Sequence, residues 1–259
     1  LILPDFQDQY AQGNYGSYSL RYTNGWGPKI ADVQDQQFTD FMGRQVTLKA
    51  HPGNIKDFFI TGDTYINSIA LSGGDDHSDY RLGVTSTNAT GIVPNQKQNK
   101  YNVSANVGHK FNDKLSSRIT FNYAKDDVNG RPAQSSNDPN ILTSSIYTIP
   151  TTVDINDLKN NYEDDEGNQI FLSTDKDGNN PYWIVNKNQH NSTNNRFFGS
   201  GQISYKPIEW LTIEDNVGFD ISHQLQHSFV RQGTAGDLKG SYEDYTIFQR
   251  RINNDFIVT

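Results

Sequence analysis

The sequence predicts an all-β fold: an antiparallel β-barrel segment with long loops at one end of its strands. Three observations predict it. Apolar and polar side chains alternate with a period of two along several windows. Short and long connections between these windows alternate strictly. The polar faces of the windows are dominated by small and amide side chains, Ser, Thr, Asn, Gln and Gly.

The first 64 residues do not alternate, and they read as a loop region. Short helical pieces are predicted within it at 33–42 and 54–59. Residues 65–259 hold the predicted strands, so we expect an extracellular loop region, 1–64, followed by a region of antiparallel barrel strands, 65–259.

Alternation is clearest in four windows, 101–111, 115–123, 197–205 and 211–229, and weaker in 65–73, 80–88 and 247–258. In the second window Ile119, Phe121 and Tyr123 share one face and lie opposite polar residues. Such a strand has one apolar and one polar face. We expect the apolar faces to meet lipid and the polar faces to meet a water-filled lumen. The residues predicted to face the lumen are Arg118, Asn122, Gln202, Glu214 and Asn216.

The connections predict which ends of the strands lie together. Tight turns fall at 73–78, 112–114 and 206–209, and long connections at 89–99, 126–195 and 231–244. A soluble sandwich has no reason to keep this asymmetry, whereas outer-membrane barrels have short periplasmic turns and longer outer loops. Tyr205 and Trp210 flank one short turn, where an aromatic girdle would lie.

Two further expectations concern the outer side. The window 211–229 would reach about 60 Å at about 3.3 Å per residue, so it should project well beyond a bilayer. The connection 126–195 is too long for a structureless loop in a compact domain. A helix is predicted within it at 153–161, with Asp154 as its N-cap.

Composition narrows the classes of function. The chain has 259 residues, no cysteine and a net charge of −8, and we count 28 asparagines. The acidic balance argues against an electrostatic grip on nucleic acid. The absence of cysteine in the chain excludes disulfides and zinc–thiolate sites. No apolar run approaches the roughly 18 residues of a membrane-spanning helix. The chain begins at Leu1 and ends on an apolar stretch, so we expect a piece of a longer protein.

Several short motifs occur in a characteristic order. The first is Leu3-Pro4-Asp5-Phe6-Gln7-Asp8-Gln9-Tyr10-Ala11-Gln12-Gly13, followed by Trp26-Gly27-Pro28. A longer one runs over residues 51–62, from His51-Pro52-Gly53-Asn54 to Ile60-Thr61-Gly62. Later motifs are Leu71-Ser72-Gly73-Gly74, Gly91-Ile92-Val93-Pro94-Asn95, Gly130-Arg131-Pro132, Val153-Asp154-Ile155-Asn156-Asp157-Leu158 and Asn179-Asn180-Pro181-Tyr182-Trp183. Together they resemble the SusC/RagA family of TonB-dependent outer-membrane transporters, through about residue 222.

The alternation of apolar and polar residues predicts strands only, whereas this resemblance also implies the size of the barrel, its function and its partners. It implies part of a barrel of about 22 strands, plugged by an N-terminal domain that this chain lacks. It implies import of glycans, oligosaccharides or peptides across the cell outer membrane of a Bacteroidetes-type Gram-negative bacterium. The implied partners are a SusD-like lipoprotein lid, the TonB complex through parts missing here, membrane lipid or lipopolysaccharide, and the glycan or peptide substrate.

The residues do not point to an enzyme, and we predict no catalytic residue, metal or cofactor. His223 and His227 would lie roughly 13 Å apart on a strand, too far for one metal ion. In an EF-hand frame that starts at Ser173, position 12 is Ile184, where a bidentate glutamate is required. Gly199-Ser200-Gly201 lacks the third glycine of a dinucleotide loop. A glycosidase pair of carboxylates is a spatial feature for which the sequence gives no indication.

Aromatic side chains in the loops are candidates for contact with a substrate or a lid, because sugars and peptides bind by stacking and by hydrogen bonds. The candidates are Trp26, Arg131, Tyr147, Tyr182 and Trp183. For residues 179–183 the alternative is that they pack the loop onto the barrel rim or the lid. For the whole chain the alternative is a self-contained secreted all-β carbohydrate-binding or adhesion module. A β-sandwich glycosidase is a more distant third. A sandwich would bury its apolar faces against a second sheet.

Overall fold

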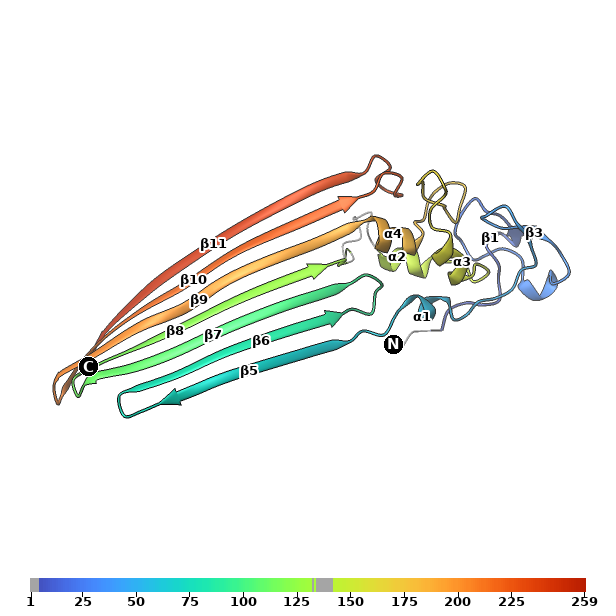
Figure 1. Ribbon diagram of the computed structural model, residues 1–259. Helices are drawn as coiled ribbons and strands as arrows, with labels where there is room; N and C mark the ends of the chain where they lie inside the picture. The colour runs from blue at the N-terminus through green and yellow to red at the C-terminus, as the bar shows by residue number, and fades with distance from the viewer. Residues whose placement is uncertain (1–4, 132, 134–141) are drawn as a thin grey trace.

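The computed structural model describes residues 5–131, 133 and 142–259, and its main feature is one antiparallel sheet of seven strands (Figure 1). The strands lie in the order β11-β10-β9-β8-β7-β6-β5, so each pairs with its neighbour in the sequence. Their bounds are β5 Thr64–Gly74, β6 Ser78–Thr90, β7 Lys97–Asn112, β8 Leu115–Asn129, β9 Gln189–Ile208, β10 Leu211–Val230 and β11 Ser241–Val258. All seven predicted strands are present, and the all-β antiparallel class is confirmed.

Several strands continue into ranges that the sequence predicts as loop. The connections span 91–96, 130–188 and 231–240 rather than 89–99, 126–195 and 231–244. The added residues are largely polar, for example Asp126 opposite Lys100 and Asn194 opposite Gln224. Backbone pairing does not depend on side-chain polarity, and hydrophobic alternation fades before the ladder ends.

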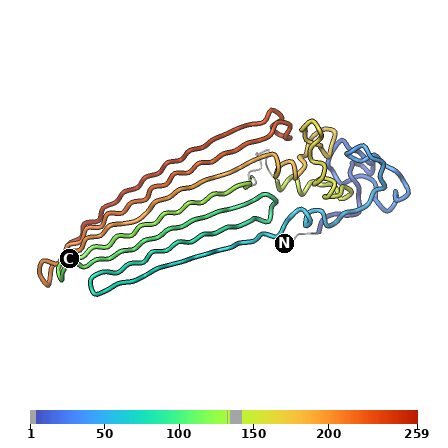
Figure 2. Tube along the Cα trace, viewed as in Figure 1, coloured from blue at the N-terminus to red at the C-terminus, as the bar shows by residue number. Residues whose placement is uncertain are grey.

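The three short turns lie at one end of the sheet and the three long connections at the other, as Figures 1 and 2 show. Short polar side chains make the turns. Asp75 accepts hydrogen bonds of 2.8 Å from the backbone N–H groups of His77 and Ser78. Asn112 accepts from Lys114 and Leu115 in the same way. Such side chains mimic a backbone turn and close a hairpin without extra residues.

The strand register separates the sheet into a polar and an apolar face. Arg118 pairs with Gln202, and Gln202 pairs with Asn216. Glu214 and Asn122 lie on the same face, since residues two or four apart on a strand share a side. The five residues predicted to face a lumen therefore share one face, which we call the polar face. That this face borders a lumen stays a prediction.

The opposite, apolar face is uncovered. The exposed fractions are 74% for Ile69, 60% for Ile119 and 66% for Ile252. The buried apolar clusters among the described residues lie in the loops, and no second sheet covers these strands. A sandwich would bury this face, so the structure contradicts the sandwich alternative.

On β8 the apolar face ends before the strand does. Tyr123 packs on Phe197 with ring centroids 4.6 Å apart. The next two residues on that face, Lys125 and Asp127, form an ion pair of 3.0 Å. The next strand in the sheet, β9, has 20 residues, as does β10 beyond it. The expected projection of the strands beyond an apolar band agrees with this change from aromatic to charged side chains.

At one end of the strands lies the loop region, a name used from here on for the described residues of 5–63 and 130–188, and it has its own packing. It contains two ribbons, β1 Gly13–Asn14 with β2 Ser17–Tyr18 and β3 Phe38–Thr39 with β4 Gln45–Val46. Its helices are η1 Ile30–Asp32, α1 Asn54–Phe58, α2 Leu142–Tyr147, α3 Ile155–Asn160 and α4 Pro181–Lys187. The larger buried cluster joins α1, α2, α3 and α4 and includes Phe58, Leu158 and Tyr182.

Two of the three predicted helices are confirmed. Residues 54–58 form α1, and Asp154 caps α3 by accepting from the N–H of Asn156 at 2.8 Å. The predicted helix at 33–42 is wrong. There Asp40 accepts from the N–H groups of Met42 and Arg44, at 2.9 and 2.8 Å, and bends the chain into the β3–β4 hairpin. Aspartate competes in this way with helical hydrogen bonds.

Candidate functional site

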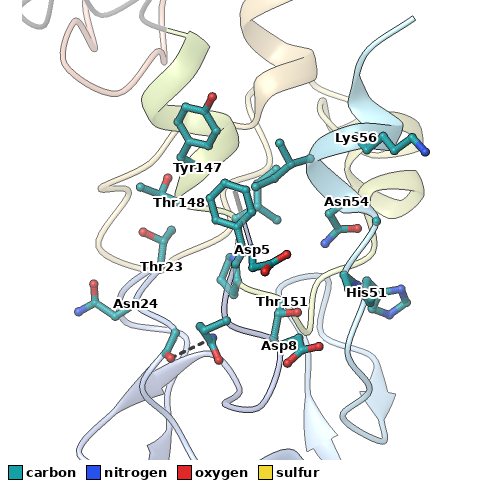
Figure 3. A pocket seen from close by; sticks show the side chains of 18 of the residues that line it. Asp5, Asp8, Thr23, Asn24, His51, Asn54, Lys56, Tyr147, Thr148 and Thr151 are labelled. Atoms are coloured by element: carbon teal, nitrogen blue, oxygen red, sulfur yellow. Dashed lines mark hydrogen bonds between the residues drawn. The ribbon is translucent and has the colours of Figure 1, made fainter. Parts of the chain in front are cut away.

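The loop region holds a cleft of about 700 Å³, which we call the aromatic cleft (Figure 3). Four segments line it: residues 5–8, 23–26, 51–56 and 147–151. The last of these begins at the end of α2 and the third includes the start of α1. The cleft brings together residues more than 140 positions apart in the sequence.

The N-terminal wall is held by one amide side chain. Gln7 donates to the backbone carbonyls of Tyr10 and Gly25, at 3.0 and 3.1 Å, and accepts from the N–H of Tyr10 at 2.9 Å. A Cβ at Gly25 would lie 2.7 Å from Nε2 of Gln7, so a larger residue there would displace this amide group. At Gly27 a Cβ would lie 2.4 Å from the carbonyl oxygen of Gln12. These close approaches explain the glycines on both sides of Trp26.

The opposite wall depends on a buried asparagine. Asn54 donates to the carbonyl of Val153 at 2.6 Å and accepts from the N–H of Ile155 at 3.0 Å. The N–H of His51 donates to the carbonyl of Thr151 at 2.8 Å. The segment 51–54 is thereby fixed against the chain that leads into α3. A buried amide that satisfies both neighbours is costly to replace.

Aromatic rings and polar groups line the cleft together. Phe6 stacks on Tyr147 with ring centroids 5.8 Å apart and planes inclined by 22°. Trp26 is 62% exposed and lies beside Tyr10, at 6.0 Å between ring centroids. The carboxylates of Asp5 and Asp8 also line the cleft. Figure 3 shows Asp5 near its middle and Tyr147 at one side. Exposed rings beside hydrogen-bonding groups fit sugars and peptides.

The predicted contact residues do not all converge. Trp26 and Tyr147 both line the aromatic cleft. Arg131 is exposed at the start of the long connection, and its N–H donates to the carbonyl of His190 at 3.1 Å. Tyr182 and Trp183 are 6% and 0% exposed, so the structure assigns them to packing and corrects the expectation of direct contact.

Buried residues of the motif 179–183 join two of the long connections, 130–188 and 231–240. Nε1 of Trp183 donates to the hydroxyl of Thr234 at 2.9 Å. Asn179 accepts from the N–H of Ala235 at 2.7 Å and donates to its carbonyl at 3.1 Å. Asn180 caps α4 through the N–H of Tyr182 at 2.9 Å. Burial also raises the pKa of the Tyr182 phenol. The alternative interpretation, that this motif packs the loop, therefore fits the geometry.

Three residues that line the cleft, Asp5, Phe6 and Asp8, are not among the predicted contacts. They belong to the motif of residues 3–13. That motif identifies the segment, but it does not show which of its side chains line a cleft. Of the motif residues, Leu3, Pro4 and Pro132 lie outside the described residues, as does 134–141 of the long connection. No spacing signal in the sequence pairs Phe6 with Tyr147.

The candidates for metal binding have other partners. His227 contacts Asp244 at 2.8 Å on the apolar face of β10 and β11. Asp175 pairs with Arg21 at 2.9 Å, and the Ser173 hydroxyl donates to Asp177. Over residues 5–131, 133 and 142–259, no group of three or more His, Asp or Glu side chains is placed to hold a metal ion.

No described helix has both the length and the hydropathy needed to cross a membrane.

Comparison with known proteins adds information on the fold. No family model matches this chain, and neither does any curated protein sequence. Three similar solved structures are the RagAB peptide importer in its closed-closed state, the same importer in its open-open state, and the RagAB peptide transporter. The first gives a TM-score of 0.59 at 14% identity over 96% of this chain. The other two give TM-scores of 0.56 and 0.57, both at 16% identity, over 78% and 87% of this chain.

The match covers only part of each neighbour. This chain spans 30%, 22% and 24% of the three transporter chains, in the order given. At such identity the likeness concerns the fold alone. The fold of this chain is thus an antiparallel sheet with long connections at one end, and it resembles a part of the RagAB transporters.

Proposed function

We propose that this chain is part of the barrel wall and outer loops of a SusC-like, TonB-dependent importer in the outer membrane. The observation that carries the proposal is the uncovered apolar face of a seven-stranded sheet whose short turns all lie at one end. Lipid is the environment in which such a face is stable. The fold likeness to RagAB transporters supports the same conclusion.

The aromatic cleft supplies a place for a substrate on the outer side of this wall. Its rings can stack on a sugar or a side chain, and its carboxylates and amides can orient polar groups. Peptides or oligosaccharides are therefore the proposed substrate class. The resemblance to SusC proteins adds a SusD-like lipoprotein lid over the loops, and TonB acting through parts of the protein beyond this chain.

A test uses cells that express the full-length protein and take up labelled peptides or oligosaccharides. Trp26→Ala combined with Tyr147→Ala should lower uptake severalfold, because both exposed rings of the cleft are removed. The control is Trp210→Ala, since Trp210 is 77% exposed at a short turn far from the cleft. Absence of the protein from the outer-membrane fraction would contradict the proposal. So would uptake that persists when TonB is removed.

A further inference from the structure

A small pocket lies where the start of the connection 130–188 meets its end. It measures about 20 Å³, which is room for one atom of about the size of a water molecule. The residues that line it include Gly130, Arg131, Ile184, Val185, Asn188 and His190. They lie in the middle of the chain, and the two strands that border the pocket, β8 and β9, each have a partner strand on both sides.

Asn188 brings a buried donor without an acceptor to this pocket. The residue is 8% exposed, and its Nδ2 is buried and has no hydrogen-bond partner. Its Oδ1 accepts from the N–H of Arg231 at 2.8 Å. A reversed amide would set its NH2 group against that N–H, so this hydrogen bond fixes which end of the amide is Nδ2. Native structures rarely leave such a donor unsatisfied, because its desolvation is costly.

The walls of the pocket are fixed by hydrogen bonds that use their backbone acceptors. The carbonyl of His190 accepts from the N–H of Arg131 at 3.1 Å, and the carbonyl of Val185 accepts from Nδ2 of Asn95 at 2.9 Å. The guanidinium group of Arg131 has no partner among residues 5–131, 133 and 142–259. No Asp or Glu of the described chain lines the pocket. A guanidinium group and an amide NH2 only donate, so together they favour a ligand that accepts and carries negative charge.

We propose that this pocket binds one halide ion, chloride in the natural setting, through Nδ2 of Asn188 and the guanidinium group of Arg131. A halide is a single atom, whereas a carboxylate or phosphate ion has several and exceeds the volume of about 20 Å³. The side chains of Ile184 and Val185 lower the local polarity, which strengthens both contacts. The ion joins the start of the connection 130–188 to Asn188, whose Oδ1 already holds the connection 231–240. This inference does not depend on the proposed function, because it concerns how these connections are held together.

The first test is diffraction from crystals of the purified full-length protein in sodium bromide, because bromide replaces chloride and its anomalous scattering identifies it. The wild type should show an anomalous peak beside Nδ2 of Asn188, and Arg131→Gln should show none. A water molecule instead of bromide in the wild type would overturn the inference. A peak of equal height in Arg131→Gln would also overturn it.

The second test is limited proteolysis of the same protein in sodium chloride and in sodium gluconate at equal ionic strength. A ligand that binds only the ordered connections protects them, so the wild type should be cleaved severalfold more slowly in chloride. Arg131→Gln should be cleaved at the same rate in both salts. The matched control is Arg231→Gln, which removes the same charge from an exposed side chain and keeps the backbone N–H that binds Asn188. It should keep the chloride effect. Equal rates in both salts for the wild type would contradict the inference, as would loss of the effect in Arg231→Gln.

Discussion

Trp183 illustrates how a single buried side chain joins two distant connections. Its ring is fully buried, and its one polar group has the hydroxyl of Thr234 as a partner. Thr234 is itself fully buried and donates to the carbonyl of Arg231 at 2.7 Å. A buried N–H that loses its acceptor cannot recover the bond from water. The outer loops should therefore depend on this contact for their order.

Thr234→Val should destabilise the outer loops by about 1–3 kcal/mol, because the N–H of Trp183 is left buried without an acceptor. Limited proteolysis of the purified full-length protein measures this as faster cleavage between residues 142 and 240. Thr174→Val is the control, since Thr174 is exposed in the same loop region. Equal cleavage rates for both variants would show that the contact contributes nothing.

Tyr18 makes the stability of the loop region depend on pH. Burial, and then the nearby Asp40, raise the pKa of its phenol to about 12 from the usual 10.0. The folded state keeps the proton where the unfolded chain loses it, so stability should fall as the pH rises from about 10 to about 12. The measurement is the free energy of unfolding as a function of pH. Tyr18→Phe should reduce its fall over this pH range, whereas Tyr15→Phe, at a fully exposed position, should leave it unchanged.

Ile119 tests which face of the sheet meets lipid. Its side chain is 60% exposed and lies within the apolar stretch of β8, before the charged end of the strand. Ile119→Arg should cost about 2–4 kcal/mol near the midplane of a bilayer, whereas an arginine on the lumen face is tolerated. Asn122→Arg on the polar face of the same strand is the control. Folded fractions after insertion into lipid vesicles measure both. Equal folding of the two variants would reverse or remove the assignment of faces.

At the scale of elements, the asymmetry of the connections predicts sidedness. The short turns should face the periplasm and the long connections the outside. Because the chain has no cysteine, a single one can be introduced as a probe, in a full-length protein freed of any other. Asp113→Cys probes a short turn, where the side chain is 97% exposed. Glu166→Cys probes an exposed position in the connection 130–188.

A membrane-impermeant maleimide added to intact cells should label Glu166→Cys and leave Asp113→Cys unlabelled. Disruption of the outer membrane should then expose both thiols, which controls for reactivity. Labelling of Asp113→Cys alone on intact cells would invert the topology and place the aromatic cleft in the periplasm.

At the scale of the whole molecule, the proposed lid would bind the loops at the end of the strands that carries the long connections. They have their own buried clusters, and the connection 231–240 presents Leu238 with 59% of its surface exposed. A permanent lid complex should bury more than about 2,000 Å². Leu238→Asp should lower the amount of lipoprotein that copurifies with the full-length protein severalfold. Ile208→Asp, at the opposite end of the sheet, should not. Unchanged recovery with Leu238→Asp would remove this loop from the interface.

The sequence by itself determined the properties that are local to a strand or a helix end. A period of two places Arg118 and Ile119 on opposite faces whatever lies around them. The asparagine and aspartate turns mark one end of the sheet, and Asp154 starts α3 because its carboxylate meets the next N–H groups. The ends of the strands were predicted less accurately, because backbone pairing continues beyond the point where apolar and polar side chains stop alternating.

The tertiary structure alone decided which loop aromatics are buried and which are exposed. Trp183 and Trp26 look equivalent in the sequence, yet Trp183 is fully buried and Trp26 is 62% exposed. The difference lies in partners far along the chain. Thr234 accepts from Trp183 across 51 positions, while the aromatic cleft beside Trp26 takes its other wall from residues 147–151. Packing between distant segments has no period, so no window of the sequence could show it.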